Sequence, residues 1–263
     1  MLKHIIFIAL ITCSPFLRAE VIQIGFVEYP PHVINRNGVP TGSLVDYARE
    51  AAKKSGNQLQ AELLPYKRSL IEVSANNIDF LMPIINPKDL PLRHLQLLFT
   101  EVPGLCFLKT NYIPMLSAKR KLFNLNIGYM DGLAHLDTLT RSGADLISIP
   151  GSNFIGRSMK MLRAGRLDAF YHPNPSETYS VKNDSPLIIA CSQFHGIENR
   201  VFVARSSKIY RNPVKSFENM FASLQGVFPY IEYAALVAGR KCNSDSENTT
   251  KFIEYKNSLL SLD

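Results

Sequence analysis

The sequence predicts an α/β protein built from two units of comparable size. Stretches rich in β-branched residues alternate with helical patterns in a first series, and the same alternation begins again after residue 110. This alternation is typical of a mainly parallel sheet flanked by helices. Two extended apolar segments, 105–108 and 201–204, lie between and after the two series. Two chain crossings are what a hinged pair of lobes requires.

The first series runs from residue 21 to residue 84. Its clearest element is a helix at 42–55, in which Thr41 can act as the N-cap, apolar residues recur at helical spacing and Gly56 follows the last turn. The expected elements in chain order are a strand at 21–27, this helix, a strand at 58–64, a helix at 67–75 and a strand at 78–84.

The second series repeats the pattern, and a helical segment follows it. The expected elements are a strand at 126–129, a helix at 132–142, a strand at 145–149, a helix at 153–164 and a strand at 167–171. The segment 213–239 carries Phe and Met residues at helical spacing, which indicates core packing rather than a cofactor site.

The N-terminal segment has the charged, apolar and polar order of a secretory signal peptide. Its apolar run, 5–12, is too short to span a membrane. We expect residues 1–19 to be removed by cleavage after Ala19, so that the mature periplasmic chain starts at Glu20. The alternative is a lipoprotein signal with Cys13 as the acylated residue. No later run is long enough for a membrane helix, so an integral membrane protein is not expected.

The charge balance is mildly basic. The chain has 29 Lys+Arg against 22 Asp+Glu, and removing Lys3 and Arg18 with the signal leaves 27 against 22. The basic residues are scattered, with 119–121 as the only tight run, whereas a nucleic-acid binder clusters them on one face. A nucleic-acid partner is therefore not expected, and the positive charge fits an anionic or carboxylate-bearing ligand.

The cysteines limit the covalent and metal chemistry. Cys106, Cys191 and Cys242 remain after signal removal, which allows at most one internal disulfide and one free thiol in an oxidising compartment. The sequence does not choose the pair. No His/Cys cluster has zinc spacing, so neither a metal nor another cofactor is expected.

Three groups of residues, taken in order, carry a resemblance to a known family. They are Ile24-Gly25 with Tyr29-Pro30-Pro31, then Ile78-Asp79-Phe80-Leu81 with Arg93 and Phe99-Thr100, then Ile127-Gly128-Tyr129 with Gly132 and the stretch 162–169. Their order and spacing resemble the extracellular solute-binding proteins of family 3, the polar amino-acid type that includes histidine-binding and lysine/arginine/ornithine-binding proteins.

The resemblance implies a fold and a role. The fold is that of a type II-like periplasmic binding protein, with lobe one at 20–106 plus 203–263, lobe two at 107–202, and a cleft between them. The implied role is capture of a small ligand by a monomer that delivers it to an ABC permease or signals through a periplasmic sensor domain. Strand ends and helix N-termini would line such a cleft.

The resemblance also implies ligand-binding residues in lobe one. Arg93 matches the family's carboxylate-binding arginine, for which a planar guanidinium is well suited. Tyr29 matches the aromatic ring that covers the ligand, and Tyr66 and Arg68 resemble a variant of some members. Asn86 stands where the family carries small hydroxyl residues and becomes the main hydrogen-bonding side chain there.

Lobe two departs from the family at its amine-binding aspartate, which is missing from the stretch 170–175. A buried ammonium without a carboxylate is poorly compensated, so we expect a ligand other than an ordinary α-amino acid. Tyr171, His172 and Asn174 can supply a ring and neutral hydrogen bonds, although His172 could instead only cap a strand end. Asp131 and His135 are weaker candidates.

Asp79 and Asp168 occupy corresponding places, each opening a strand after a helix and turn. We expect them to accept turn N–H groups rather than to form an acid/base pair. Without a nucleophile elbow or a zinc-protease motif, the chain is not expected to be an enzyme. Two alternatives remain, a periplasmic enzyme like cyclohexadienyl dehydratase and an interaction module that has lost its ligand.

Overall fold

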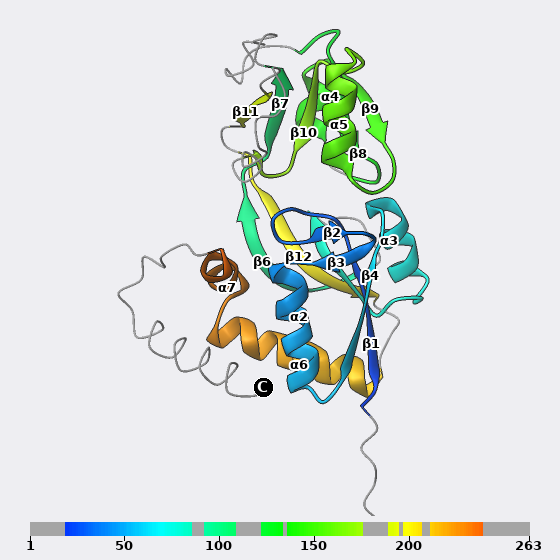
Figure 1. Ribbon diagram of the computed structural model, residues 1–263, viewed down its shortest axis with the longest axis vertical. Coiled ribbons are helices and arrows are strands. Elements are labelled where there is room, and N and C mark those ends of the chain that lie inside the picture. Colours follow the sequence, from blue (N-terminus) through cyan, green and yellow to red (C-terminus); the bar gives the residue numbers. More distant parts are fainter. Residues whose placement is uncertain are drawn as a thin grey trace, which may run out of the picture.

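The computed structural model describes residues 19–85, 92–108, 122–133, 136–175, 189–194, 197–206 and 211–238. Two five-stranded sheets lie one above the other along the long axis of the molecule (Figure 1). Cys242, Asn86, His135 and the basic run at 119–121 lie outside the described residues. Within the described residues, no helix is both long and apolar enough to cross a membrane.

The first sheet has the strand order β4-β1-β5-β12-β6. Its strands are β1 (Val21–Phe26), β4 (Gln58–Leu63), β5 (Phe80–Ile85), β6 (Leu92–Glu101) and β12 (Asn199–Ser206). Strand β1 runs parallel to β4 and β5, and β12 runs antiparallel to β5 and β6. A two-stranded hairpin of β2 (Ile34–Arg36) and β3 (Val39–Thr41) is attached to this part.

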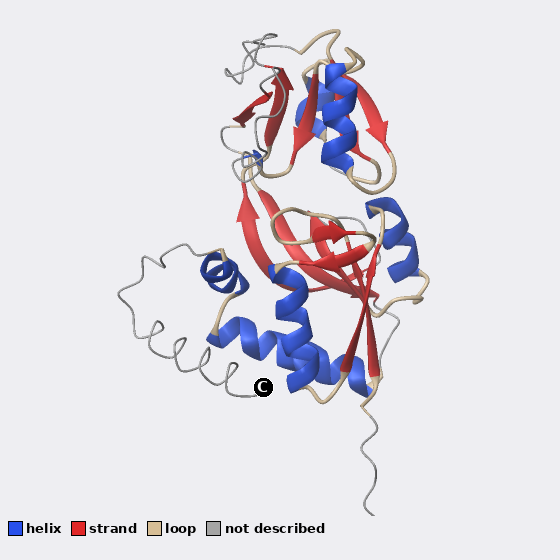
Figure 2. Cartoon of the chain, viewed as in Figure 1, coloured by secondary structure: helices blue, strands red, loops and turns tan. Residues whose placement is uncertain are grey.

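Helices accompany the first sheet (Figure 2). They are α2 (Ser43–Lys54), α3 (Tyr66–Ser74), α6 (Asn212–Val227) and α7 (Tyr230–Val237). Helix α2 forms where the sequence predicts it, and its buried face includes Leu44, Val45 and Ala48. Its N-cap, however, is Gly42, because the Thr41 hydroxyl donates to the carbonyl of Ile34 in the β2–β3 hairpin.

The second sheet has the order β11-β7-β10-β8-β9. Its strands are β7 (Gly104–Leu108), β8 (Asn126–Met130), β9 (Asp145–Ile149), β10 (Ala169–His172) and β11 (Ile189–Gln193), and its helices are α4 (Asp137–Arg141) and α5 (Phe154–Arg163). Strand β8 is parallel to β9 and β10, and β7 is antiparallel to β10 and β11. Helix α4 is shorter than predicted, because a turn with positive φ at Gly132 precedes it.

The crossings between the sheets lie slightly earlier in the chain than the sequence analysis placed them. The first sheet ends with Glu101 of β6, and Gly104 already pairs within the second sheet. On the way back, β12 belongs to the first sheet from Asn199 onward. The two apolar extended segments are therefore each a strand of one sheet rather than a connection between two.

The disulfide joins Cys106 of β7 to Cys191 of β11. The two residues are directly opposite each other in the antiparallel ladder. The sequence could not select this pair, because the two cysteines become neighbours only through strand pairing.

Candidate functional site

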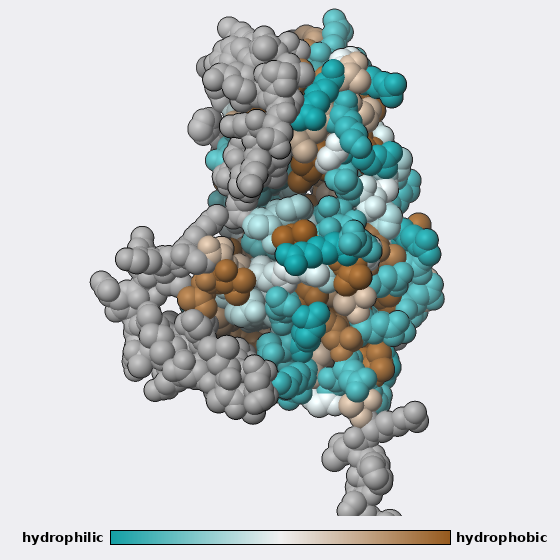
Figure 3. Space-filling model, in the orientation of Figure 1, coloured by the Kyte–Doolittle hydropathy of each residue, from teal (hydrophilic) through white to brown (hydrophobic). Residues whose placement is uncertain are grey.

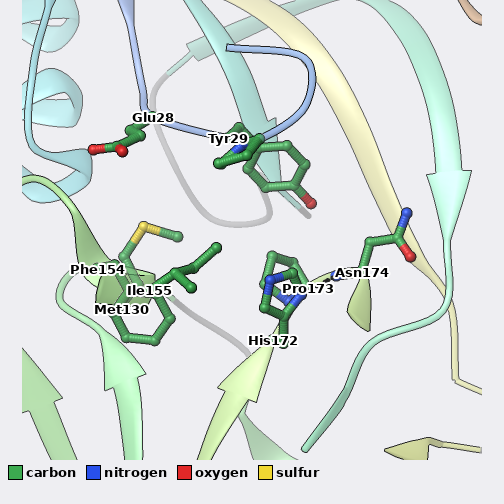
Figure 4. A pocket seen from close by; sticks show the side chains of 9 residues that line it. Glu28, Tyr29, Met130, Phe154, Ile155, His172, Pro173 and Asn174 are labelled. Atoms are coloured by element: carbon green, nitrogen blue, oxygen red, sulfur yellow. Dashed lines mark hydrogen bonds between the residues drawn. The ribbon is translucent and has the colours of Figure 1, made fainter. Parts of the chain in front are cut away.

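A cavity lies where the two sheets face each other. It is lined by residues that follow β1, end β8, open α5, and end or follow β10: Glu28, Tyr29, Pro30, Met130, Phe154, Ile155, His172, Pro173 and Asn174 (Figure 4). In sheets with parallel strands, ligands bind outside the carboxyl ends of the strands. The location of the cavity follows this rule, because β1, β8 and β10 all end beside it.

The lobes are close together around this cavity. The Glu28 Oε2, on the side of the first sheet, accepts the backbone N–H of Asn153 at the start of α5, at 2.7 Å. The Nζ of Lys67 lies 3.5 Å from Oδ2 of Asp131. The cavity has a volume of about 30 Å³, room for a few water molecules. An organic ligand can enter only if the lobes first move apart.

His172 presents a buried donor to the cavity. Its side chain is 2 % exposed, and burial lowers the pKa of the imidazole to about 4, so the ring is neutral at pH 7. Its Nδ1 accepts the backbone N–H of Asn174 at 3.0 Å. The proton of the neutral ring is therefore assigned to Nε2. This Nε2 is buried and has no hydrogen-bond partner among the described residues.

Tyr29 presents a second buried polar atom from the opposite sheet. Its hydroxyl also has no hydrogen-bond partner in the described part of the chain, and the residue is 4 % exposed. The ring is fixed by His32, with centroids 6.2 Å apart, and by Phe99, at 6.5 Å. An unsatisfied buried polar group costs about 1–3 kcal/mol, which a ligand that bonds to it can recover.

The rest of the wall is mainly apolar. Met130, Phe154 and Ile155 lie together on the side of the second sheet in Figure 4. Asn153 caps α5 by accepting the N–H of Gly156 at 3.1 Å, and this cap places Phe154 and Ile155 in the first turn beside the cavity. The combination of an apolar wall with a few polar groups is typical of small-molecule sites.

Of the residues that the sequence analysis selected, Tyr29, His172 and Asn174 line the cavity. Tyr66 and Tyr171 are buried and are not among the lining residues. The Tyr66 hydroxyl bonds to the backbone of Ile85, and burial raises its pKa to about 12. The Tyr171 hydroxyl accepts from the side-chain amide of Asn199 at 2.9 Å.

The two arginines lie elsewhere. Arg68 is exposed and pairs with Glu72 within α3. Arg93 is 56 % exposed and pairs with Glu218 of α6. In the sheet, Arg93 of β6 pairs with Arg205 of β12, and Arg205 pairs with Phe80, the first residue of β5. The cavity lies beyond the opposite end of the sheet, where β1 ends. The carboxylate-binding role expected for Arg93 therefore has no support in this arrangement, because the register of β6 places it at the far end of the sheet.

Several lining residues were not predicted from the sequence, and Glu28 is the most important of them. It supplies a carboxylate to the cavity from lobe one, although the sequence analysis found no anionic partner for an ammonium. The available signal was its position two residues after β1, at a strand end. Met130 and the first turn of α5 could have been found by the same rule.

A larger groove, about 300 Å³, lies between α7 and the segment around Ser43. Its polar side chains His32 and Ser43 both bond to the Tyr230 hydroxyl, at 2.7 and 2.8 Å. The remaining lining is apolar, continuous with the hydrophobic surface over α7 in Figure 3. The groove is formed by one lobe only, so closure of the lobes cannot enclose a ligand there.

No protein-family model matches the chain, and no curated protein matches it. Solved structures do match. One is a mutant arginine-binding protein from T. maritima, at 14 % identity over 82 % of this chain and 94 % of that chain, with a TM-score of 0.67. A second is a substrate-binding protein of an amino acid ABC transporter, at 16 % identity over 82 % and 98 %, with a TM-score of 0.64.

A third is the ancestral amino-acid-binding protein AncCDT-1, described as a precursor of cyclohexadienyl dehydratase, at 14 % identity over 81 % of this chain and 92 % of that chain, with a TM-score of 0.62. At these identities the likeness concerns the fold alone. The predicted fold class is confirmed: this chain has the two-sheet architecture of type II-like periplasmic binding proteins.

Proposed function

We propose that the protein is an exported solute-binding protein that encloses a small ligand between its two lobes. The observation that carries the proposal is a pair of buried polar atoms at the cavity, the Tyr29 hydroxyl and His172 Nε2, neither of which has a hydrogen-bond partner among the described residues. They come from opposite sheets, so a ligand that bonds to both links the two lobes and favours lobe arrangements in which both contacts can form. The cleavage after Ala19 that would release the chain into the periplasm is part of this proposal.

Binding without chemistry fits the imidazole at the cavity better than catalysis does. A general base works best when its pKa is near the operating pH. The pKa of His172 is about 4, so its ring is a weak base at pH 7. We expect no aromatic product when the protein is incubated with prephenate or arogenate. Formation of such a product would overturn the proposal in favour of a dehydratase.

The closed, loaded form would then be recognised by a membrane partner, either an ABC importer or a periplasmic sensor. Support comes from similar structures whose names describe amino-acid-binding proteins of ABC transporters. The sequence expectation of a carboxylate-bearing ligand has less support, because the described residues that line the cavity include no Lys or Arg.

The test is a thermal-shift panel of amines, amino acids, organic acids, small sugars and short peptides. A ligand at a hundred times its dissociation constant adds about 2.7 kcal/mol to the free energy of unfolding. Tyr29→Phe should weaken the response to any active ligand. Tyr129→Phe is the matched control, since Tyr129 precedes Met130 on β8 and does not line the cavity. Silence across the panel, or equal responses of both variants, would contradict the proposal.

A further inference from the structure

The described part of the cavity lining carries negative charge. Among the lining residues that the structure describes, Glu28 is the one acidic or basic side chain besides His172, which is neutral at pH 7. Lys67, a basic group of lobe one that reaches lobe two, is paired with Asp131.

Glu28 also occupies the position where this cavity would otherwise bind an anion. A helix N-terminus offers N–H groups and a positive dipole end to negatively charged ligands. At α5 the Glu28 carboxylate reaches across from the first lobe and accepts the N–H of Asn153 through Oε2. A ligand carboxylate would have to displace it or remain beside it, and both alternatives are unfavourable.

We infer that the cavity selects a small amine with an apolar body and a neutral hydrogen-bond acceptor, and that Glu28 sets this preference against carboxylates. The inference rests on the solute-binding function proposed above. The ammonium would approach the Glu28 carboxylate, and the hydrocarbon part would pack on Met130, Phe154 and Ile155. The His172 Nε2–H and the Tyr29 hydroxyl would donate to a neutral oxygen such as an amide carbonyl.

Three compounds with one carbon skeleton separate these contributions: leucinamide, leucine and 4-methylpentanoate. The first is a cation with a neutral carbonyl, the second a zwitterion and the third an anion. Isothermal titration of the wild-type protein should give the tightest binding for leucinamide, by at least about tenfold over each of the others. Phenylalaninamide and phenylalanine repeat the comparison with a larger apolar group.

Glu28→Gln should lower the affinity for leucinamide by at least about tenfold and narrow or reverse its advantage over 4-methylpentanoate. Glu28→Asp keeps the charge and should keep the preference. Glu62→Gln is the matched control, since Glu62 is exposed on β4 and is not among the lining residues. Circular dichroism and the melting temperature establish that each variant is folded; if Glu28→Gln is not, Glu28→Asp and the wild-type ligand series still decide the question.

Two results would overturn the inference and leave the solute-binding function standing. One is tighter binding of the carboxylates, or of a sugar or organic acid from the wider panel, by the wild-type protein. The other is an unchanged amine preference in folded Glu28→Gln. If the wild-type protein responded to no compound of either set, the proposed function would be wrong, and the inference would fail with it.

Discussion

The two sheets use an aspartate in the same way but in different surroundings. Asp79 directly precedes β5 and accepts the N–H of Gln23 in β1, at 2.9 Å. Asp168 directly precedes β10 and accepts the N–H of Asn126 in β8, at 2.8 Å. Asp79 is also buried and paired with Arg211, whereas Asp168 makes no ion pair among the described residues. The contact between the aspartate and the neighbouring strand is thus accompanied by an ion pair in the first lobe but not, among the described residues, in the second.

The lobes also differ in what joins their strands. In the first sheet every residue of β5 is buried, and α6 packs Phe217 against Phe80 with ring centroids 4.7 Å apart. In the second sheet β7 and β10 are equally buried, and the Cys106–Cys191 disulfide ties the half-buried outer strand β11 to β7. Side-chain packing is thus common to both lobes, and the second adds a covalent link.

The largest expected effect comes from removing that link. By the loop-entropy relation, a disulfide that closes a loop of 85 residues adds about 4–5 kcal/mol to the free energy of unfolding. The double variant Cys106→Ser, Cys191→Ser should therefore be strongly destabilised. Hydrogen exchange should show most of the lost protection in β7, β10 and β11. Cys242→Ser is the control and should change little; equal loss of protection in β1 and β5 would contradict the difference between the lobes.

The next effect concerns the buried histidines of the two lobes. His32 in the first lobe is bonded to Tyr230 through Nδ1, whereas His172 in the second has an unpartnered Nε2 among the described residues. Because burial lowers the pKa of His172 from its ordinary 6.5 to about 4, the unfolded chain binds a proton in this interval that the folded chain does not. His172 thus favours the folded state above about pH 6.5, and this contribution is lost as the pH falls toward 4.

The expected loss is on the order of 3 kcal/mol at pH 4 relative to pH 7. His172→Gln removes the titrating group, so its urea unfolding free energy should depend less on pH across this interval. If the unfolding free energies of the wild-type protein and the variant depended on pH in the same way, His172 would not be buried as a neutral ring. A ligand that accepts a hydrogen bond from Nε2–H should deepen the wild-type dependence.

Sequence patterns predicted the elements well because strands and helices leave local signals. Helix α2 shows its apolar spacing and its terminal glycine directly in the sequence. The two strand-opening aspartates were also expected, because an aspartate in a turn has a local task. The pairing of Cys106 with Cys191 was not available, since it depends on which strands become neighbours.

The site was predicted less completely, for a related reason. Arg93 has the family's spacing to Phe99, yet the register of β6 against β12 carries it away from the cavity. Glu28 has no motif of its own and gains meaning only when α5 of the other lobe meets it. Residues whose roles depend on contacts between lobes cannot be recognised by spacing within one lobe.

The smallest expected effect concerns the ion pair between Asp79 and Arg211. Replacement of aspartate by asparagine keeps an oxygen that can accept the strand N–H but removes the charge. Asp79→Asn should lower the free energy of unfolding by about 1–2 kcal/mol, because the substitution leaves the Arg211 guanidinium without its buried partner. The loss is this small because Arg211 is partly exposed to solvent. Asp168→Asn should cost less than about 0.5 kcal/mol, since only the N–H contact is at stake. Urea unfolding of both variants measures the difference. Equal costs would mean that the ion pair with Arg211 adds nothing to the stability of the first lobe.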